Sequence, residues 1–192
     1  MDIQDRVPAQ DLNGTAMPRL FIAIELPPAI TAELARLQPR PAPGLRLSSA
    51  EQMHITLHFL GEADVLPIKN ALQSVAVPAF SLQLAGLGQF RSRGDNVALW
   101  AGVEVSEELL ALHAGITAVL ADAGTRLQSY RYKPHITLAR CKPGMPAALI
   151  PAFLAQQFSL PFIPVTGFGL YSSTLTKDGP LYCREQWFAL QA

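Results

Sequence analysis

The sequence predicts an α+β protein with a bilobal shape, in which two pseudo-symmetric, mostly antiparallel sheets carry outer helices and enclose a central cleft. Three observations lead to this prediction. The tetrapeptide HITL occurs twice, at 54–57 and 135–138. Each copy occupies the same place in a similar order of elements, namely strand, helix, HITL strand, helix, strand. The 192 residues, 49% of them hydrophobic, suffice to bury a core that both lobes share.

The first half begins after a polar segment. Residues 1–17 show no hydrophobic period, so we expect a flexible N-terminal tail followed by a single two-lobed domain at 18–192. The apolar run RLFIAIEL at 19–26 predicts a buried strand. The elements that follow are bounded by Gly, Pro and polar residues: a helix at 28–37, a loop at 39–44, a strand at 53–61, a helix at 64–76 and a strand at 80–88.

The second half repeats this order. After the polar turn RSRGDN, the run NVALWAGV at 96–103 predicts a strand. Ser106 is expected to cap a helix at 106–123, because the apolar residues there recur at helical spacing. The elements after Gly124 are the HITL strand at 133–140, a helix at 146–157 and strands within 161–173 and 181–190.

Composition excludes several classes of function. The 15 basic and 15 acidic residues balance, so no global charge marks a nucleic-acid or membrane binder and any anion site must be local. Cys141 and Cys183 have no metal-binding spacing and are expected to be free thiols, which favours a reducing cytoplasm. No apolar stretch is long enough to span a bilayer. We expect a cytoplasmic monomer with no membrane partner.

The repeated strand has one polar face. Alternate residues of a strand point to opposite sides, so His54, Thr56 and His58 are expected on one face. In the second copy His135 and Thr137 share a face. The isoleucine and leucine of each copy then pack under the helices. If the lobes turn their polar faces toward each other, two histidines and two threonines meet in the cleft.

Two imidazoles across a cleft suit general acid–base catalysis near neutral pH. A threonine beside each histidine can hydrogen-bond an anionic oxygen, and cleavage of a phosphoester needs one proton delivered and another removed. The segment from Gly124 to Lys177 supports an anionic substrate, because it contains no Asp or Glu. Its basic residues are Arg126, Arg131, Lys133, Arg140, Lys142 and Lys177. Strand parity places Arg140 opposite His135, unless the strand ends or bulges there.

Simpler interpretations remain for single residues. One HITL alone is more often an ordinary strand, whereas two copies in equivalent positions favour catalysis. His54 and His58 have HxxxH spacing, but on a strand they lie roughly 13 Å apart, so no metal site is expected. His58 is interpreted as a wall of the cleft or a solvated group, and His113 as structural.

Aromatic residues near the two motifs are candidates for stacking on a base. Phe21 and Tyr132 are left open between base stacking and core packing. Trp100 is interpreted as core, because aromatic residues in strands are more often buried.

The two motifs and their flanks resemble those of the two-histidine phosphoesterases. The stretches RLFIAIELP at 19–27, MHITLHFLGE at 53–62, FSLQLAGLGQF at 80–90 and YKPHITLAR at 132–140 are similar to the bacterial RNA 2′,3′-cyclic phosphodiesterases, also called 2′-5′ RNA ligases. The resemblance covers nearly the whole chain after the tail. It implies a bilobal fold and hydrolysis of a 2′,3′-cyclic phosphate on RNA to a 2′-phosphomonoester, without a metal or another cofactor.

The resemblance also implies roles for single residues. His54 would donate a proton to the departing 3′-oxygen, and His135 would accept one from the attacking water. Thr56 and Thr137 would hold the non-bridging oxygens, and Arg140 stands where the family usually has an arginine that contributes to activity. His58 departs from the arginine or lysine often found at its position. With Arg131, Tyr132 and Phe21 it forms a second group of candidates for substrate contact.

Three functions remain open at this point. The first is a metal-independent cyclic phosphodiesterase that acts on RNA ends or small cyclic nucleotides. The second is a non-catalytic module that binds nucleotides or RNA ends. The third is ligation that forms 2′-5′ bonds, which the same residues could support as the reverse reaction.

Overall fold

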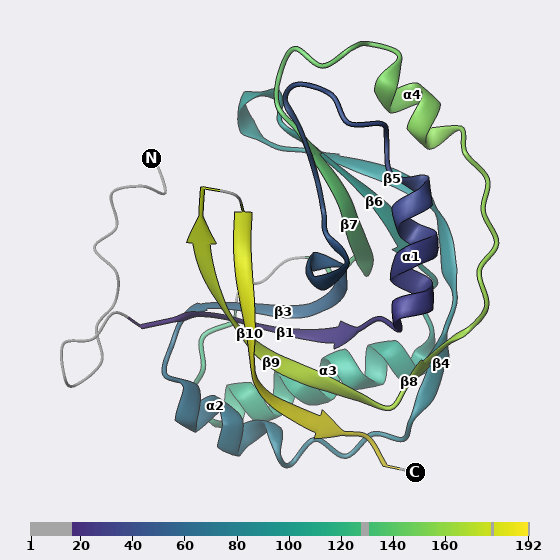
Figure 1. The fold of residues 1–192 in the computed structure, drawn as a ribbon. Helices are drawn as coiled ribbons and strands as arrows, with labels where there is room; N and C mark the ends of the chain where they lie inside the picture. The colour runs from purple at the N-terminus through teal and green to yellow at the C-terminus, as the bar shows by residue number, and fades with distance from the viewer. Residues whose placement is uncertain (1–16, 128–130, 178, 192) are drawn as a thin grey trace.

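The computed structural model describes residues 17–127, 131–177 and 179–191, apart from the side chain of Arg93. The tail expected at 1–17 lies outside these residues except for Met17. The described chain forms two four-stranded antiparallel sheets, a two-stranded sheet and four α-helices (Figure 1). The predicted α+β class with two antiparallel sheets is confirmed.

Sheet I has the strand order β10-β9-β1-β3. Its strands are β1 (Arg19–Glu25), β3 (His54–Glu62), β9 (Gly167–Thr176) and β10 (Gly179–Ala189). Strand β1 pairs with β3 on one side and β9 on the other, and its residues 20–24 are all buried. Both faces of this strand are therefore covered, which is why it shows a continuous apolar run.

Sheet II has the strand order β2-β7-β6-β5. Its strands are β2 (Leu45–Leu47), β5 (Leu84–Arg91), β6 (Val97–Val103) and β7 (His135–Cys141), and a separate pair joins β4 (Phe80–Leu82) to β8 (Ile163–Val165). The predicted strand at 80–88 is thus split between β4 and β5. Strand β2 was not predicted; three residues are too few to show a hydrophobic period.

The helices begin close to the predicted residues. They are α1 (Pro28–Leu37), α2 (Val65–Leu72), α3 (Glu107–Asp122) and α4 (Leu149–Leu154), with 3₁₀ turns η2 (Ala50–Gln52) and η3 (Arg93–Asp95). Helix α1 has the predicted bounds, and the Ser106 side chain caps α3 by accepting a hydrogen bond from the Leu109 amide. Helices α2 and α4 are shorter than predicted.

The lobes of the structure differ from the halves of the sequence. Sheet I takes β9 and β10 from the second half, and sheet II takes β2 and β5 from the first. The units that correspond are β1-α1-β3 and β6-α3-β7. Helix α3 lies with α2 below sheet I, whereas α1 lies beside sheet II (Figure 1). One hydrophobic cluster contains buried residues of both sheets, so the exchange of elements joins the lobes through a common core.

A β-bulge interrupts each HITL strand after its threonine. In sheet I, Thr56 pairs with Ala23 and His58 with Ile22, which leaves Leu57 as an extra residue. In sheet II, Leu138 is extra in the same way between β6 and β7. Both leucines are fully buried. Each bulge reverses the alternation of side chains along its strand. Because of the bulge in β7, Arg140 points to the same face as His135, whereas simple alternation would place it on the opposite face.

The bulge in β3 overturns the prediction for His58. This side chain is 5% exposed, and its Nε2 donates to the His113 carbonyl of α3 at 3.2 Å. Its ring stacks on that of His113 with the centroids 4.2 Å apart, and His113 stacks on Tyr132 at 4.0 Å. The expectation that His58 shares a face with His54 is therefore wrong. His58 is neither a wall of the cleft nor a solvated group.

This stack is expected to make the protein sensitive to acid. Burial, and then the charge of His58, lower the pKa of His113 to about 4. Between its ordinary pKa of about 6.5 and the lowered value of about 4, His113 binds a proton in the unfolded chain but not in the folded stack. The free energy of unfolding therefore falls as pH drops from 6.5 toward 4. Denaturant titrations at about pH 7 and about pH 4.5 measure this loss. His113→Phe keeps a stacked ring without titrating and should lose less; equal losses would contradict the prediction.

Candidate active site

A cleft of about 1150 Å³ lies between the two sheets, and both HITL strands line it. His54 and Thr56 reach it from β3, and His135 and Thr137 reach it from β7. The paired leucines and isoleucines of the motifs point away from the cleft and are fully buried. The structure thus brings together the two histidine–threonine pairs that the sequence places 81 positions apart, by residue number, in equivalent strands.

Each histidine is held by a backbone carbonyl two residues before it. His135 Nδ1 donates to the Lys133 carbonyl at 2.7 Å, and a ring nitrogen of His54 bonds the Gln52 carbonyl. A carbonyl oxygen only accepts hydrogen bonds, so the bonded nitrogen carries the proton. In the neutral ring the other nitrogen is then free of a proton and can act as a base.

Both histidines favour the neutral form. Burial, followed by the charges of His135 and Arg140, lowers the pKa of His54 to about 4. The pKa of His135 is also lowered, first by burial and then by Arg140 and Lys133. Because Arg140 affects both rings, its guanidinium lies close to the pair. A bound phosphate would offset these positive charges and raise both pKa values.

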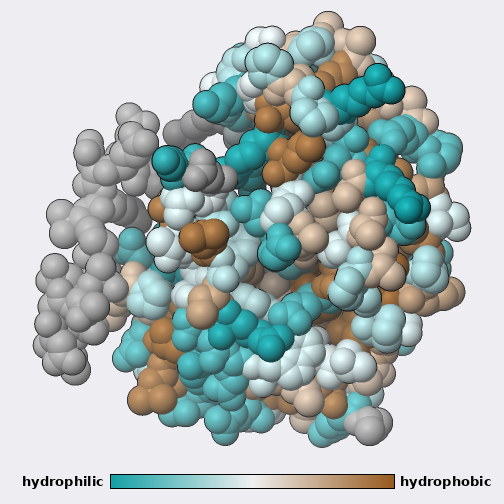
Figure 2. Space-filling model, in the orientation of Figure 1, coloured by the Kyte–Doolittle hydropathy of each residue, from teal (hydrophilic) through white to brown (hydrophobic). Residues whose placement is uncertain are grey.

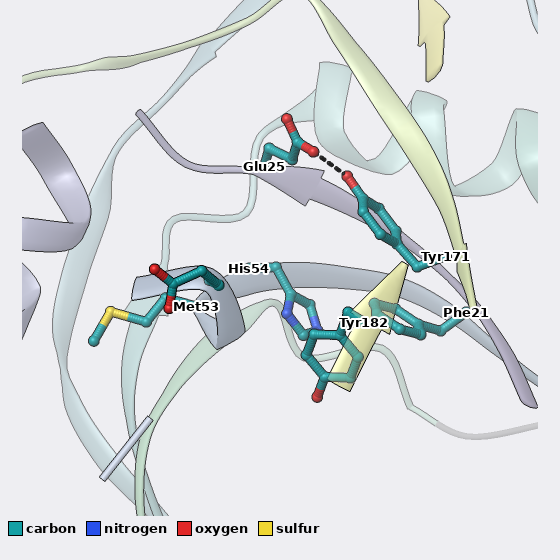
Figure 3. A pocket seen from close by; sticks show the side chains of 7 residues that line it. Phe21, Glu25, Met53, His54, Tyr171 and Tyr182 are labelled. Carbon is teal, nitrogen blue, oxygen red and sulfur yellow. Dashed lines mark hydrogen bonds between the residues drawn. The ribbon is translucent and has the colours of Figure 1, made fainter. Parts of the chain in front are cut away.

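Aromatic rings support His54 on the side of sheet I. The Tyr182 ring meets the imidazole edge-on with centroids 5.3 Å apart, and Phe21 packs at 4.9 Å (Figure 3). Phe21 is only 4% exposed and stacks on Tyr171. It therefore lies at the site as packing beneath His54, with too little exposed surface for a base to stack on.

Behind His54 lies a small cavity of about 60 Å³ that Glu25 also lines. The Tyr171 hydroxyl donates to Glu25 at 2.5 Å (Figure 3). Arg184 pairs with the same carboxylate at 2.9 Å. These contacts neutralise and fix the one carboxylate of β1 near His54. Burial, followed by the Glu25 contact, raises the pKa of Tyr171 and keeps its hydroxyl protonated.

A second aromatic group surrounds His135. Phe90 meets the imidazole edge-on at 4.8 Å, and Trp100 lies 6.2 Å away. The Lys133 ammonium lies 4.4 Å from the centre of the Trp100 ring. Trp100 is buried as predicted, and Gly88 on β5 makes room for it, because a Cβ there would lie 2.1 Å from the ring. The core thus extends to the edge of the site.

The described lining of the cleft contains basic residues and no Asp or Glu. Its cations are Arg19, Arg46, Arg140, Lys142 and Lys177. A protein with equal numbers of acidic and basic residues thus concentrates positive charge where the histidines lie. Arg131 is exposed and Tyr132 packs on His113, and neither lines the cleft.

Two residues of the site were missed from the sequence. Arg46 lies on the unpredicted strand β2, where its position between two leucines was the only available indication. The sequence predicts that Tyr182 lies in a strand, but nothing in the surrounding sequence distinguishes it from the other tyrosines. Arg46 precedes the first HITL motif by eight residues but joins the second HITL strand, and Tyr182 lies well beyond both motifs, so each reaches the cleft only through sheet pairing.

Two further structural findings concern metals and membranes. Among the described residues, no group of three or more His, Cys, Asp or Glu side chains could hold a metal ion. None of the helices in the described part is both long and apolar enough to cross a membrane. On the face drawn in Figure 2, hydrophobic residues form separate spots among hydrophilic ones.

Comparisons of the sequence with known proteins agree with one another. The family model of the 2′-5′ RNA ligase superfamily matches residues 26–174. The RNA 2′,3′-cyclic phosphodiesterase of Thermus thermophilus is 35% identical over 186 residues, which cover 90% of this chain and 90% of the relative. The RNA 2′,3′-cyclic phosphodiesterase of Escherichia coli is 32% identical over 180 residues and covers 90% of this chain and 96% of the relative.

Solved structures are similar over the same length. A crystal structure from Thermus thermophilus matches with a TM-score of 0.76 at 33% identity and covers 91% of this chain and 98% of its own. The structure of Escherichia coli LigT complexed with NADP+ matches with a TM-score of 0.68 at 26% identity, covering 92% of this chain and 99% of that one. LigT complexed with ATP gives a TM-score of 0.67 at 25% identity, with coverage of 92% and 99%.

Proposed function

Since the chain belongs to the 2′-5′ RNA ligase superfamily, we propose that it hydrolyses the 2′,3′-cyclic phosphate at the end of an RNA strand to a 2′-phosphomonoester, without a metal ion. The relatives are RNA 2′,3′-cyclic phosphodiesterases, and the chain is an enzyme of this class. We propose the 2′-phosphate product, the independence from metal and the roles of the single residues given below. The observation that carries it is the pair of histidines, each with a threonine, in one basic cleft.

The reaction needs two proton transfers on opposite sides of phosphorus. A water oxygen attacks the phosphorus while His135 Nε2 takes its proton, since the hydrogen bond to Lys133 leaves that nitrogen unprotonated in the neutral ring. The bond from phosphorus to the 3′-oxygen breaks, and the imidazolium of His54 gives that oxygen a proton. The product carries a 2′-phosphate and a 3′-hydroxyl. Return of one proton to His54 and loss of one from His135 restore the protonation states from which the next bound substrate reacts.

The remaining side chains stabilise the charge on the phosphoryl group. Thr56 and Thr137 lie one on each HITL strand, two residues beyond the histidines on the same face, and donate to the non-bridging oxygens. Arg140 supplies positive charge beside both rings, where negative charge develops in the transition state. Tyr132, Arg131 and His58 take no part, because they lie outside the cleft.

The test is an assay of product identity. The protein is incubated in EDTA with an oligoribonucleotide that ends in a 2′,3′-cyclic phosphate. The product is identified by its mass and by whether treatments specific for a 2′-phosphate or for a 3′-phosphate remove its phosphate. We expect a 2′-phosphomonoester, formed at the same rate with EDTA as without it. Binding without turnover would favour the non-catalytic module, and turnover that requires added metal would refute the proposed chemistry.

The pH dependence follows from the two lowered pKa values. The profile of kcat/KM reports ionisations of the free enzyme, and a bell-shaped profile has its maximum midway between them. Both histidines have a pKa below the ordinary value of about 6.5, so the maximum is expected on the acid side of that value. The pH optimum of kcat should lie above that of kcat/KM, because bound phosphate raises the pKa of both histidines. A kcat/KM maximum above about pH 7 would contradict this prediction.

A further inference from the structure

The cleft contains an arginine that the proposed reaction does not use. Arg46 on β2 pairs directly with Arg140 on β7, and both side chains line the cleft. Like charges opposite each other on neighbouring strands destabilise a sheet. None of the ion pairs among the described residues involves either arginine. The sheet therefore holds two adjacent positive charges whose repulsion no carboxylate of the described residues offsets, and a bound anion would offset it.

Contacts with the β9–β10 hairpin position Arg46 across the cleft. A Cβ built on Gly179 would lie 3.1 Å from Arg46 Nη1, so the guanidinium lies against the hairpin backbone. The Gln52 amide donates to the Pro180 carbonyl at 3.0 Å and fastens the same turn to the segment before β3. Arg46 thus connects sheet II to the hairpin of sheet I, which limits its freedom before any ligand binds.

Tyr182 completes the surroundings of this arginine. Its ring lies edge-on to His54. Burial raises the pKa of its hydroxyl, and the nearby charges of Arg140 and Arg46 oppose this effect only in part. The hydroxyl therefore stays protonated and can donate to an anion. Lys142 lies at the same end of the cleft, where its amide donates to the Gly44 carbonyl just before β2.

The size of the cleft allows more than one nucleotide. Sites for small molecules usually enclose roughly 300–1,000 Å³, and this cleft has about 1150 Å³. Arg140 lies close to the histidines and so belongs to the reacting phosphate. Arg46 lies one strand farther out, at a spacing of about 5 Å. A second phosphate of the same RNA strand can therefore reach Arg46 while the first remains between the histidines.

We propose that Arg46, Tyr182 and Lys142 form a second phosphate subsite, which binds the phosphodiester on the 5′ side of the terminal nucleotide. This inference rests on the proposed function, since it assumes a cyclic phosphate between the histidines. With this subsite, the enzyme prefers an RNA end of at least two nucleotides to a cyclic mononucleotide. The neighbouring phosphate then supplies binding energy that a mononucleotide lacks.

The experiment compares a cyclic mononucleotide with a dinucleotide that ends in a 2′,3′-cyclic phosphate. A third substrate is the same dinucleotide with an uncharged methylphosphonate linkage. We expect the wild type to have a kcat/KM for the charged dinucleotide that exceeds the other two by roughly tenfold or more. Arg46→Gln should remove most of this preference. It should also reduce the slope of log kcat/KM against log salt for the dinucleotide by about 0.7.

Controls separate the subsite from general effects. Arg36→Gln removes an arginine from the exposed face of α1, where it pairs with Glu33, and should leave the preference intact. Arg46→Lys keeps the charge and should retain part of the salt dependence. Melting temperatures of the variants exclude loss of folding. If Arg46→Gln slows all three substrates by the same factor, or if the methylphosphonate reacts as well as the charged dinucleotide, the subsite does not exist.

A binding measurement keeps this inference separate from the proposed function. The probes are a dinucleotide and a mononucleotide that each carry a 2′-phosphate. Tighter binding of the dinucleotide by the wild type, lost in Arg46→Gln, supports the subsite even if no substrate is hydrolysed. Absence of turnover would then refute the hydrolytic function alone. Equal affinity of the two probes for the wild type would overturn the subsite whatever the enzyme does.

Discussion

Alanine in place of either His54 or His135 is expected to lower kcat for a 2′,3′-cyclic-phosphate oligonucleotide by roughly 10²–10⁴-fold. Each imidazole lines the cleft and is oriented by a backbone carbonyl, so its removal deletes one of the two proton transfers. The double variant should fall little below the weaker single variant, because the two groups act in one transition state. Initial rates under saturating substrate measure the effect.

A histidine outside the cleft provides the matched control. His113→Phe removes an imidazole from α3 while a ring remains between His58 and Tyr132, so its rate near neutral pH should stay close to wild type. Circular dichroism spectra and melting curves of all variants confirm folding. If the two alanine variants give the same product yield as the wild type, neither histidine is an acid or a base in this protein.

Arg140→Ala is expected to lower kcat by about 10²-fold, as loss of one preorganised group that stabilises developing negative charge does in other enzymes. The guanidinium lies near both imidazoles, whose pKa values it lowers. Its removal should therefore also raise the pKa of both histidines toward the ordinary value. Titration of the imidazole resonances by NMR, with and without inorganic phosphate, measures that shift independently of activity.

Two variants bracket this result. Arg140→Lys keeps the positive charge but not the planar pair of donors, and should recover part of the rate. Arg36→Ala, on the outer helix α1, should change neither the rate nor the imidazole pKa values. An Arg140→Ala enzyme with unchanged kcat would show that the arginine lies in the cleft without taking part in the reaction.

Local features of the chain explain the elements that were predicted well. Helix α1 has the predicted bounds because Pro28 starts it, and α3 starts where Ser106 caps it. Hydrophobic period and capping act within a few residues, so the sequence displays them directly. The pairing of His54 with Thr56, and of His135 with Thr137, follows from the same local alternation.

Long-range pairing explains what was not predicted. His58 was assigned to the wrong face because simple alternation fails at Leu57, where the strand bulges against β1. The equivalent bulge at Leu138 turns Arg140 into the cleft. A bulge is a mismatch between two strands, and no single strand reveals it. The assignment of strands to lobes has the same origin, since β2 and β5 join the sheet of the opposite half.

The presence of a histidine and a threonine on one face of each of two equivalent strands follows from local sequence, because side-chain alternation is a property of one strand. The resemblance of these motifs to two-histidine phosphoesterases pointed to the family. The approach of further side chains to the two histidines depends on contacts in the folded protein. Arg140, which the resemblance also indicates, enters the cleft through a bulge between β6 and β7. Arg46 enters through the pairing of edge strand β2 with β7, and Tyr182 through a hairpin that pairs with β1, and these pairings join segments far apart in the chain.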